Sequence, residues 1–241
     1  MLLSHESPAC IMNYITDFCD YNYYLDVFML NKKYNDYFRK NSKCTYLDCS
    51  LYERTRREIE DLDRGVYIAL YNKLIKDMDV YMIIPDYINS KNKNIESIES
   101  FKNINAKKII TVHGKDRSEY ISCLRYYLDN TEDEIIALSA GDSWMTDESR
   151  SDVISNIDLK GRKIHFFGLR SPNELNYIKE VKDKIYSLDT SLPVTCTLEN
   201  TFIGDIKQKP KTIIFDIFND DICIDYTLLI DNLKFIREIL K

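Results

Sequence analysis

Three apolar runs of this chain end on an aspartate. They are the runs that end at Asp48 in CTYLDCS, at Asp86 in VYMIIPDY and at Asp189 in KIYSLDTSLP. Burying an unpaired carboxylate costs several kcal/mol, so a strand that ends on an aspartate should place it at a rim or in a cleft. If the strands are parallel, their carboxyl ends lie on one side and the three carboxylates converge on one site. A carboxylate that attacks a sugar's anomeric carbon, with a second carboxyl group exchanging protons, performs glycosyl transfer.

Asp189 is the candidate nucleophile, and it is followed by two small hydroxyl residues and then by Pro193. Asp48 and Asp86 are the candidate partners for proton exchange. The alternative is that each strand-end aspartate caps the helix after it, as aspartate commonly does. The residues alone leave both interpretations open.

Glycines mark the same ends of the expected strands. Gly114, Gly141 and Gly168 fall at or just past a strand end, where the backbone must turn tightly or let a ligand approach closely. Ordinary turns between strand and helix are the alternative. Trp144, the only tryptophan, follows Gly141 in an expected rim loop, where it either stacks on a base or packs as a lid.

The three histidines all lie in or at the end of an apolar segment. His5 and His113 end their strands on the expected active side, whereas His165 lies early in its strand and is expected to be structural. The chain lacks the short histidine pairing that makes a metal site specific, so we predict no metal. No glycine-rich phosphate-binding motif is present, and we expect no cofactor.

The elements that position these residues follow from the apolar pattern. Strands are expected at residues 1–5, 44–50, 80–86, 108–114, 134–140, 163–169, 184–190 and 211–218. Helices are expected within residues 9–40, 53–78, 92–104, 117–129, 147–158, 172–182 and 226–240, with at most a short helix in 191–210. In the third of these helices, Ile95, Ile98 and Phe101 should form the buried face. The strands are continuous apolar runs, which is typical of parallel sheets covered on both faces.

Alternation of strand and helix predicts an α/β protein with a small (β/α)₈ TIM-barrel-like fold, formed by residues 1–241 as a single domain. An open doubly wound sheet is the structural alternative. The chain has 241 residues, of which 44% are hydrophobic and 30% charged. That is enough material for a substantial core.

Charge and cysteine usage narrow the class of protein. The net charge is −6 and the isoelectric point is near 5.2, which argues against tight nonspecific binding of a polyanion but allows a local groove. The seven cysteines form no C-x-x-C pair and suit free thiols in a reducing compartment. No apolar run approaches the roughly 20 residues of a membrane span, and the N-terminus lacks a secretory pattern. We therefore expect a cytoplasmic protein without membrane association.

The order of the strand-end motifs over residues 44–195 resembles that of the tRNA-guanine transglycosylase family, whose bacteriophage relatives insert 7-deazaguanines into DNA. The family's Asp-Ser-Gly-Gly-(Phe/Tyr)-Gln, Phe-Asp and Val-Gln-Gly-Gly motifs are similar to residues 48–53, 85–87 and 112–115. Its Ala-Leu-Gly-Gly turn is similar to residues 137–141, and its Tyr-Leu-Met-Gly-Val-Gly-x-Pro segment to residues 165–172. Its Phe-Asp-Cys-Val-x-Pro-Thr-Arg motif is similar to residues 188–195, with the proline four residues after the aspartate in both.

The resemblance implies a TIM barrel that exchanges a guanine base through a covalent glycosyl-aspartate, without a cofactor. By that resemblance Asp189 is the nucleophile and Asp48 the proton-handling acid/base, while Asp86 and His113 read the purine edge. The backbone from Ser139 to Gly141 would meet the base carbonyl. Gly168 and Trp144 complete the set of expected substrate contacts.

Departures from the family pattern keep three functions open. Both glycines of the first motif are replaced, the family's zinc site of three cysteines and one histidine is absent, and so is the arginine beyond the proline. The loss of the zinc site and the arginine favours DNA, or a nucleoside-sized ligand, over tRNA, and the loss of the glycines favours an inactive barrel whose base pocket is narrowed. The alternatives to base exchange are an N-glycoside hydrolase or transferase acting on nucleosides or nucleotides, and an inactive barrel that binds a nucleobase-like ligand. A homodimer is also open, and a phage-encoded member would act in the host cytoplasm.

Overall fold

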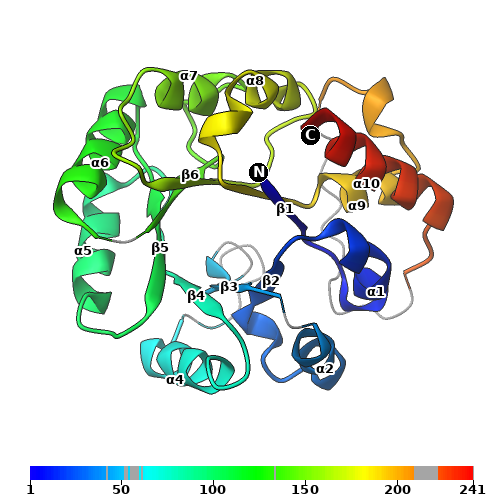
Figure 1. The fold of residues 1–241 in the computed structure, drawn as a ribbon, viewed down its shortest axis with the longest axis horizontal. Coiled ribbons are helices and arrows are strands. Elements are labelled where there is room, and N and C mark those ends of the chain that lie inside the picture. The colour runs from blue at the N-terminus through cyan, green and yellow to red at the C-terminus, as the bar shows by residue number, and fades with distance from the viewer. Residues whose placement is uncertain are drawn as a thin grey trace. The chain divides into compact units, whose positions relative to one another are not determined.

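The computed structural model describes residues 1–41, 43–51, 54, 60, 62–132, 134–208 and 222–240. Eight parallel strands alternate with helices, and the sheet order is β1-β8-β7-β6-β5-β4-β3-β2 (Figure 1). Sequential parallel strands joined by helices are the topology of a (β/α)₈ barrel, which confirms the predicted α/β, TIM-barrel-like fold class.

All strands except β2 overlap strands that the sequence predicts. They are β1 (Leu2–His5), β2 (Asn22–Leu25), β3 (Thr45–Asp48), β4 (Val80–Ile83), β5 (Lys107–Val112), β6 (Ile135–Ser139), β7 (Lys163–Phe167) and β8 (Ser187–Thr190). The remaining predicted strand, at residues 211–218, lies outside the described residues.

The prediction of one helical stretch over residues 9–40 is wrong. The structure divides it into α1 (Met12–Ile15), β2 and α2 (Lys32–Lys40), with 3₁₀ turns at Ala9–Ile11, Thr16–Phe18 and Asp26–Phe28. The β2 segment is fully buried and pairs in parallel with β3. A run rich in tyrosine suits either a helix or a strand, and pairing with β3 decides between them.

The other helices lie where the apolar pattern predicts them. They are α4 (Arg64–Leu74), α5 (Lys91–Phe101), α6 (Arg117–Asn130), α7 (Ser149–Ser155), α8 (Glu174–Val181), α9 (Leu192–Leu198) and α10 (Tyr226–Leu240), with 3₁₀ turns at Lys182–Lys184 and Ile203–Asp205. Side-chain caps set several starts: Asp63 accepts from the Val66 N–H at 3.0 Å, and Asp116 accepts from the Glu119 N–H at 2.9 Å. No helix in the described part of the chain is long and apolar enough to cross a membrane.

The chain divides into two compact units, and the expected single domain stays a prediction. Unit 1 comprises Met1–Asp20 with Leu138–Lys241, and unit 2 comprises Tyr21–Ala137. In unit 1, α1, α9 and α10 lie side by side near β1 (Figure 1). Their shared core contains Ile11, Ile15, Cys19, Val194, Leu229 and Leu233.

Strand alternation gives the sheet of unit 1 a polar face and an apolar face. The register pairs Ser4 with Asp189 and His165 with Ser187. The polar face therefore carries Ser4, His165, Ser187 and Asp189. The opposite face carries Leu3, Phe166 and Leu188, all buried. Helices cover this second face, since the α7 guanidinium of Arg150 lies 4.4 Å from the Phe166 ring centre.

Unit 2 repeats this division. Tyr24 of β2 packs against Tyr34 and Phe38 of α2, with ring centres 5.0 Å apart in each pair. The neighbouring residue, Tyr23, therefore points to the face away from α2, where its hydroxyl meets Asp48. The sheet face opposite the helices therefore carries Asp189 in unit 1 and Asp48 in unit 2.

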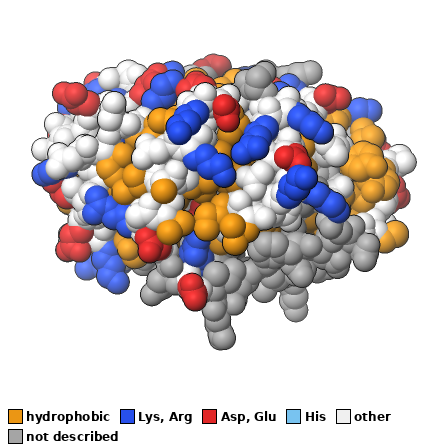
Figure 2. Space-filling model, turned by 90° about the horizontal axis from the view of Figure 1, so that it is seen from below, with side chains coloured by type: hydrophobic (Ala, Val, Ile, Leu, Met, Phe, Trp, Pro, Cys, Tyr) orange, Lys and Arg blue, Asp and Glu red, His pale blue; other side chains and the backbone are white. Residues whose placement is uncertain are grey.

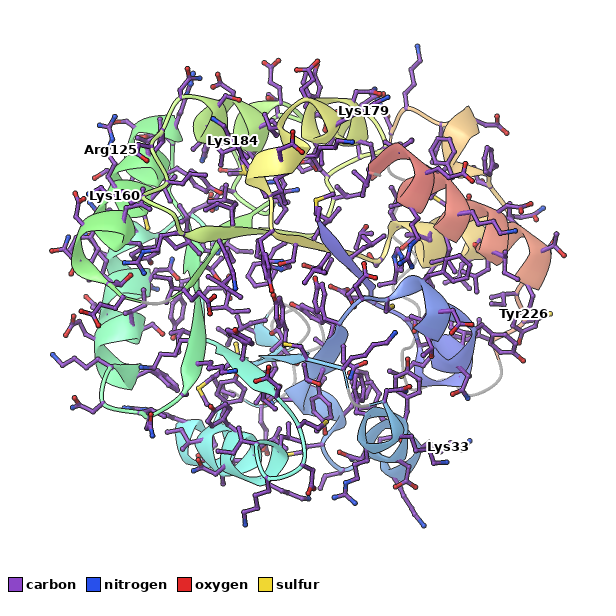
Figure 3. The ribbon with its side chains drawn as sticks, viewed as in Figure 1. Lys33, Arg125, Lys160, Lys179, Lys184 and Tyr226 are labelled. Carbon is purple, nitrogen blue, oxygen red and sulfur yellow. The ribbon has the colours of Figure 1, made fainter. Side chains whose placement is uncertain are left out.

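Several charged side chains on the helices point away from the core. Lys33, Arg125 and Lys179 lie on α2, α6 and α8, and all three are exposed (Figure 3). On the face drawn in Figure 2, lysine and arginine side chains are interspersed with acidic and hydrophobic ones. Mixed charge of this kind is typical of a solvated surface.

Candidate functional site

Asp189 lies on the polar face of unit 1, in β8, and is only 1% exposed. Its Oδ2 accepts a hydrogen bond from the Gly168 N–H at 3.2 Å. Its Oδ1 lies 2.9 Å from His165 Nε2, although the two atoms are out of line for a hydrogen bond. Helix α9 begins after Ser191, so Asp189 is not at the N-cap position that the alternative interpretation requires.

The surroundings of Asp189 bring its pKa close to neutral pH. Burial raises its pKa to about 6, while hydrogen bonds from the Glu6 side chain and the Gly168 N–H, and the charge of Arg150, act in the opposite direction. The carboxyl group is therefore mostly ionised at pH 7 and is a stronger base than an exposed aspartate. A buried carboxylate with raised basicity is suited to nucleophilic attack.

His165 is brought to Asp189 by the pairing of β7 with β8, although the sequence predicts a structural role for it. Its Nδ1 lies 2.9 Å from Ser187 Oγ, and the ring is fully buried. Burial, followed by the charge of Arg150, lowers the pKa of His165 to about 3, so the ring is neutral at pH 7. The only signal in the sequence was a histidine inside an otherwise apolar strand, and its partner depends on a strand register that the sequence does not reveal.

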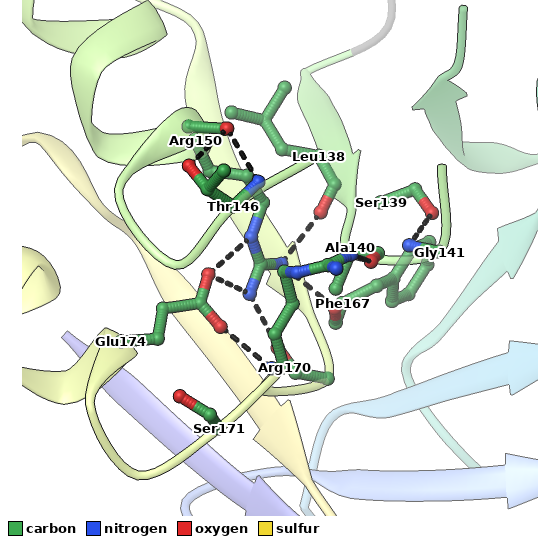
Figure 4. A network of polar contacts seen from close by, with 12 residues as sticks. Leu138, Ser139, Ala140, Gly141, Thr146, Arg150, Phe167, Arg170, Ser171 and Glu174 are labelled. Atoms are coloured by element: carbon green, nitrogen blue, oxygen red, sulfur yellow. Dashed lines mark hydrogen bonds and ion pairs between the residues drawn. The ribbon is translucent and has the colours of Figure 1, made fainter. Parts of the chain in front are cut away.

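A fully buried ion pair, Arg150 with Glu174, holds the ends of β6 and β7 (Figure 4). The Arg150 Nη2 lies 2.7 Å from Glu174 Oε1. The guanidinium also donates to the carbonyls of Leu138, Phe167 and Gly168 at 2.9, 2.8 and 2.7 Å. It thereby fixes the turn whose N–H contacts Asp189. Nothing in the sequence distinguished Arg150 or Glu174 from surface charges.

The loop after β6 carries the predicted base contacts Ser139, Gly141 and Trp144. Ser139 Oγ accepts from the Gly141 N–H at 3.0 Å, and Arg170 Nη1 donates to the Ala140 carbonyl at 2.6 Å (Figure 4). Ser139 is buried, Gly141 is exposed and Trp144 is half-buried. The loop is therefore fastened at its start to the segment that follows β7.

Gly168, also a predicted contact, occupies a left-handed turn. Its φ is +61°, and a Cβ at this position would meet nothing within 4 Å. Glycine is used here for backbone conformation. By contrast, a Cβ on Gly114 would lie 2.3 Å from the Tyr120 nitrogen, so Gly114 lets the start of α6 pack against the end of β5.

In unit 2, the structure brings together Asp86 and His113, the two residues that the motif resemblance assigns to the purine edge. His113 Nε2 lies 2.7 Å from Asp86 Oδ2, with the histidine fully buried and the aspartate side chain 26% exposed. Asp86 does not cap α5, whose N-cap is Ser90. One carboxyl oxygen of Asp86 therefore lies against the His113 ring, and the carboxyl group is partly exposed to solvent.

Helix α5 holds the Asp86 loop with polar side chains, which corrects the expected apolar face of Ile95, Ile98 and Phe101. Asn94 Oδ1 accepts from the Tyr87 N–H at 2.9 Å, and its Nδ2 donates to the Tyr87 carbonyl at 2.8 Å. Ser97 Oγ donates to the Pro85 carbonyl at 2.7 Å. The buried positions of α5 are Asn94, Ser97 and Phe101, while Ile95 and Ile98 are half-buried. The helix therefore clamps the residues on both sides of Asp86.

Asp48 ends β3, as predicted, and is half-buried. Its Oδ2 accepts a hydrogen bond from the Tyr23 hydroxyl, and its Oδ1 accepts from the Ser50 N–H at 2.6 Å. Ser50 has φ +54°, a conformation that favours glycine. Ser50 stands where the similar family motif has its first glycine, so the turn keeps the glycine conformation without the glycine.

His5 ends β1, as predicted, but its side chain points away from Asp189. The register pairs it with Thr190, which puts it on the opposite sheet face from Ser4 and Asp189. Burial lowers the pKa of His5 to about 4, so it is neutral at pH 7. His5 therefore belongs to the packing beneath the helices.

Within the described residues, no group of three or more histidine, cysteine, aspartate or glutamate side chains is arranged to hold a metal ion. No protein-family model matches the chain, and a search of curated proteins gave no match either. A functional proposal therefore depends on the fold, the side-chain chemistry and the motif resemblance.

Proposed function

We propose that the protein is a base-exchanging transglycosylase that replaces guanine with a 7-deazaguanine in DNA through a glycosyl-aspartate at Asp189. The main support is the environment of Asp189: a buried carboxyl group on the polar sheet face of a (β/α)₈ fold, with a pKa of about 6 and a backbone N–H from Gly168 on one oxygen. The motif order over residues 44–195 supports the same chemistry. Cytoplasmic location and DNA as partner belong to this proposal.

The reaction takes place in two displacements. Ionised Asp189 attacks C1′ of the nucleotide, and the electron pair of the breaking C–N bond leaves with the guanine, which takes a proton from an acid. By resemblance, that acid is Asp48. The incoming base then attacks C1′ and gives its ring N–H proton to the ionised Asp48, and the electron pair of the ester C–O bond returns to Asp189.

Asp86 and His113 are proposed to read the base. A partly exposed carboxylate accepts hydrogen bonds from the N1–H and the exocyclic amine of guanine, which a pyrimidine or adenine does not present together. His113 fixes the orientation of that carboxylate at 2.7 Å. Base exchange inside a duplex also requires the nucleotide to leave the stack, and an aromatic side chain such as Trp144 suits a flipped base.

The experiment is base incorporation measured by mass spectrometry. The protein is incubated with guanine-containing DNA and a 7-deazaguanine, and the DNA is digested to nucleosides. A denaturation-resistant protein–DNA adduct should form with the wild type and should be absent with Asp189→Ala. Asp183→Ala, the same change at an exposed position of unit 1, serves as the control. Absence of incorporation with every DNA and tRNA offered would remove the proposal.

A hydrolase acting on nucleosides is the second candidate, favoured by the net charge of −6. The same carboxyl groups would serve, with water as acceptor. Activity on free nucleosides that changes little with salt would favour the hydrolase. Activity that needs polymer and weakens steeply as salt rises would favour transglycosylation on DNA.

A further inference from the structure

Tyr23 contacts Asp48 but is not indicated by any sequence motif, because it lies in β2, where the sequence predicts a helix. Its hydroxyl donates a hydrogen bond to Asp48 Oδ2. The Ser50 N–H donates to the other carboxyl oxygen, Oδ1, at 2.6 Å. Each oxygen of the candidate acid therefore has a donor, one from the neighbouring strand and one from the turn after β3.

Contacts on both sides of β2 hold Tyr23 beside Asp48. The parallel register pairs Tyr23 with Tyr46, two residues before Asp48, so the three side chains share one sheet face. From α2, the Tyr34 hydroxyl accepts from the Leu25 N–H at 2.8 Å and donates to the Tyr23 carbonyl at 3.4 Å. Tyr23 is 9% exposed and Tyr34 is 3% exposed. The hydroxyl of Tyr23 is therefore directed at Asp48 from a buried and anchored ring.

A neutral donor suits an acid that must hold a proton and then release it. A hydrogen bond is roughly twice as strong when its acceptor is ionised. The bond from Tyr23 therefore strengthens as the proton leaves Asp48, and an interaction that strengthens during the reaction lowers its barrier. A permanent positive charge in contact with Asp48 would instead keep it ionised, with no proton to give. Arg54, which follows the same turn, is directed to Asp26 Oδ2 at 2.7 Å and to two backbone carbonyls.

We propose that Tyr23 is a positioning residue for the acid: it orients the Asp48 carboxyl group and stabilises the carboxylate that forms as guanine leaves. This inference rests on the proposed function. In the first displacement, the electron pair of the C1′–N bond leaves with guanine, and the proton of Asp48 passes to the guanine. Tyr23 keeps its own proton and donates to the ionised Asp48. In the second displacement, Asp48 takes the ring N–H proton of the incoming base, and the hydrogen bond from Tyr23 weakens again.

The first test does not depend on activity. The free energy of unfolding is measured at pH 7 for the wild type, Tyr23→Phe, Asp48→Ala and the double variant. Tyr23→Phe removes only the hydroxyl, so it should destabilise the wild type more than it destabilises Asp48→Ala, in which the acceptor is already lost. Tyr126→Phe, the same change at a half-buried position of α6, should be additive with Asp48→Ala. Additive effects of Tyr23→Phe and Asp48→Ala would overturn the inference.

The second test compares the rate of adduct formation on two DNAs. Guanine needs the proton of Asp48 in order to leave, so Tyr23→Phe should lower the rate at saturating guanine-containing DNA about 10- to 100-fold. The half-saturating DNA concentration should stay unchanged, because Tyr23 acts on the acid and not on recognition of the base.

7-Methylguanine supplies the matched substrate, because it already carries a positive charge and leaves without taking a proton. On DNA that contains this base, Tyr23→Phe should stay within about threefold of the wild type. Equal slowing on both DNAs, or a higher half-saturating concentration with an unchanged rate, would overturn the inference.

The two tests separate the two proposals. Energetic coupling without adduct formation in any variant, the wild type included, would remove the transglycosylase proposal and with it the role of Tyr23 in proton transfer. Adduct formation that Tyr23→Phe does not slow would support the transglycosylase and overturn the role of Tyr23.

Discussion

The described part of the chain contains two aspartate–histidine pairs, and they lie in different settings. Asp189 and His165, in unit 1, are 2.9 Å apart and both are buried, whereas Asp86 and His113, in unit 2, are 2.7 Å apart with the aspartate side chain 26% exposed. Burial raises the pKa of Asp189 to about 6 and makes it a stronger base. The comparison indicates that residue type alone does not assign a role: the buried pair suits covalent attack, and the partly open pair suits recognition of a polar edge.

The largest difference between the two pairs should come from Asp189→Asn. Loss of the nucleophile should reduce adduct formation by about 10⁴-fold or more. The same substitution should stabilise the protein at pH 7 by up to about 3 kcal/mol, because it removes a buried carboxylate whose pKa is raised from 3.8 to about 6. Chemical denaturation measures the second effect. A variant that loses both activity and stability would contradict the buried-nucleophile interpretation.

The glycines beside the two pairs should also differ. Gly114→Ala, next to His113, should cost about 3 kcal/mol, since the new Cβ would lie 2.3 Å from backbone of α6. Gly168→Ala, next to the Asp189 turn, should cost only about 1 kcal/mol, because its φ of +61° is strained for alanine but the space is open. Thermal unfolding of both variants measures the difference. Equal losses would show that close packing does not constrain Gly114.

Asp86→Asn should weaken recognition of guanine without affecting Asp189. An amide cannot accept from both guanine donors, so kcat/KM for guanine-containing DNA should fall about 100-fold. Adduct formation at saturating DNA should be reduced much less. Steady-state kinetics with a matched DNA lacking the exocyclic amine provides the control, because this substrate should be nearly insensitive to the substitution.

The sequence predicted the fold more completely than the surroundings of Asp189 and Asp86. Continuous apolar runs located β3 to β8 and most helices, since burial on both faces leaves a strong signal. The short motifs singled out Asp86 and His113 because His113 directly follows β5 and Asp86 lies just past the end of β4. These two residues could be found from the sequence because their positions depend on the local residue pattern.

The missed residues depend on tertiary contacts. Glu6, His165 and Arg150 reach the Asp189 site through strand register or from the following helix, and neither leaves a pattern in the sequence. The strand β2 was missed because its tyrosine-rich sequence suits a helix until β3 is present to pair with it. Asn94 and Ser97 were missed because a polar residue on a helix usually faces water.

The pH dependence of stability should separate Asp189 from the buried histidines. For Asp189 the folded-state pKa is raised, so its contribution falls as pH rises from about 4 to about 6. For His5 and His165 the folded-state pKa is lowered to about 4 and about 3, so the unfolded chain binds the protons and stability rises with pH up to about 6.5. Among these three groups the histidines together outweigh Asp189, and their combined slope is positive. Asp189→Asn should steepen that slope by about 1.4 kcal/mol per pH unit between pH 4 and pH 6.

The smallest expected effect concerns the turn after Asp48. Ser50 has φ +54°, so Ser50→Gly should relieve backbone strain while adding entropy to the unfolded chain, and the net change should stay below about 1 kcal/mol. Ser50→Val should cost about 2 kcal/mol, because a β-branched side chain tolerates this conformation poorly. Both variants keep the N–H that donates to Asp48 at 2.6 Å. If Ser50→Gly retains adduct formation and Ser50→Val loses it in proportion to stability, the turn conformation matters to Asp48 rather than the serine hydroxyl. The absence of a glycine at this position is then no argument against catalysis.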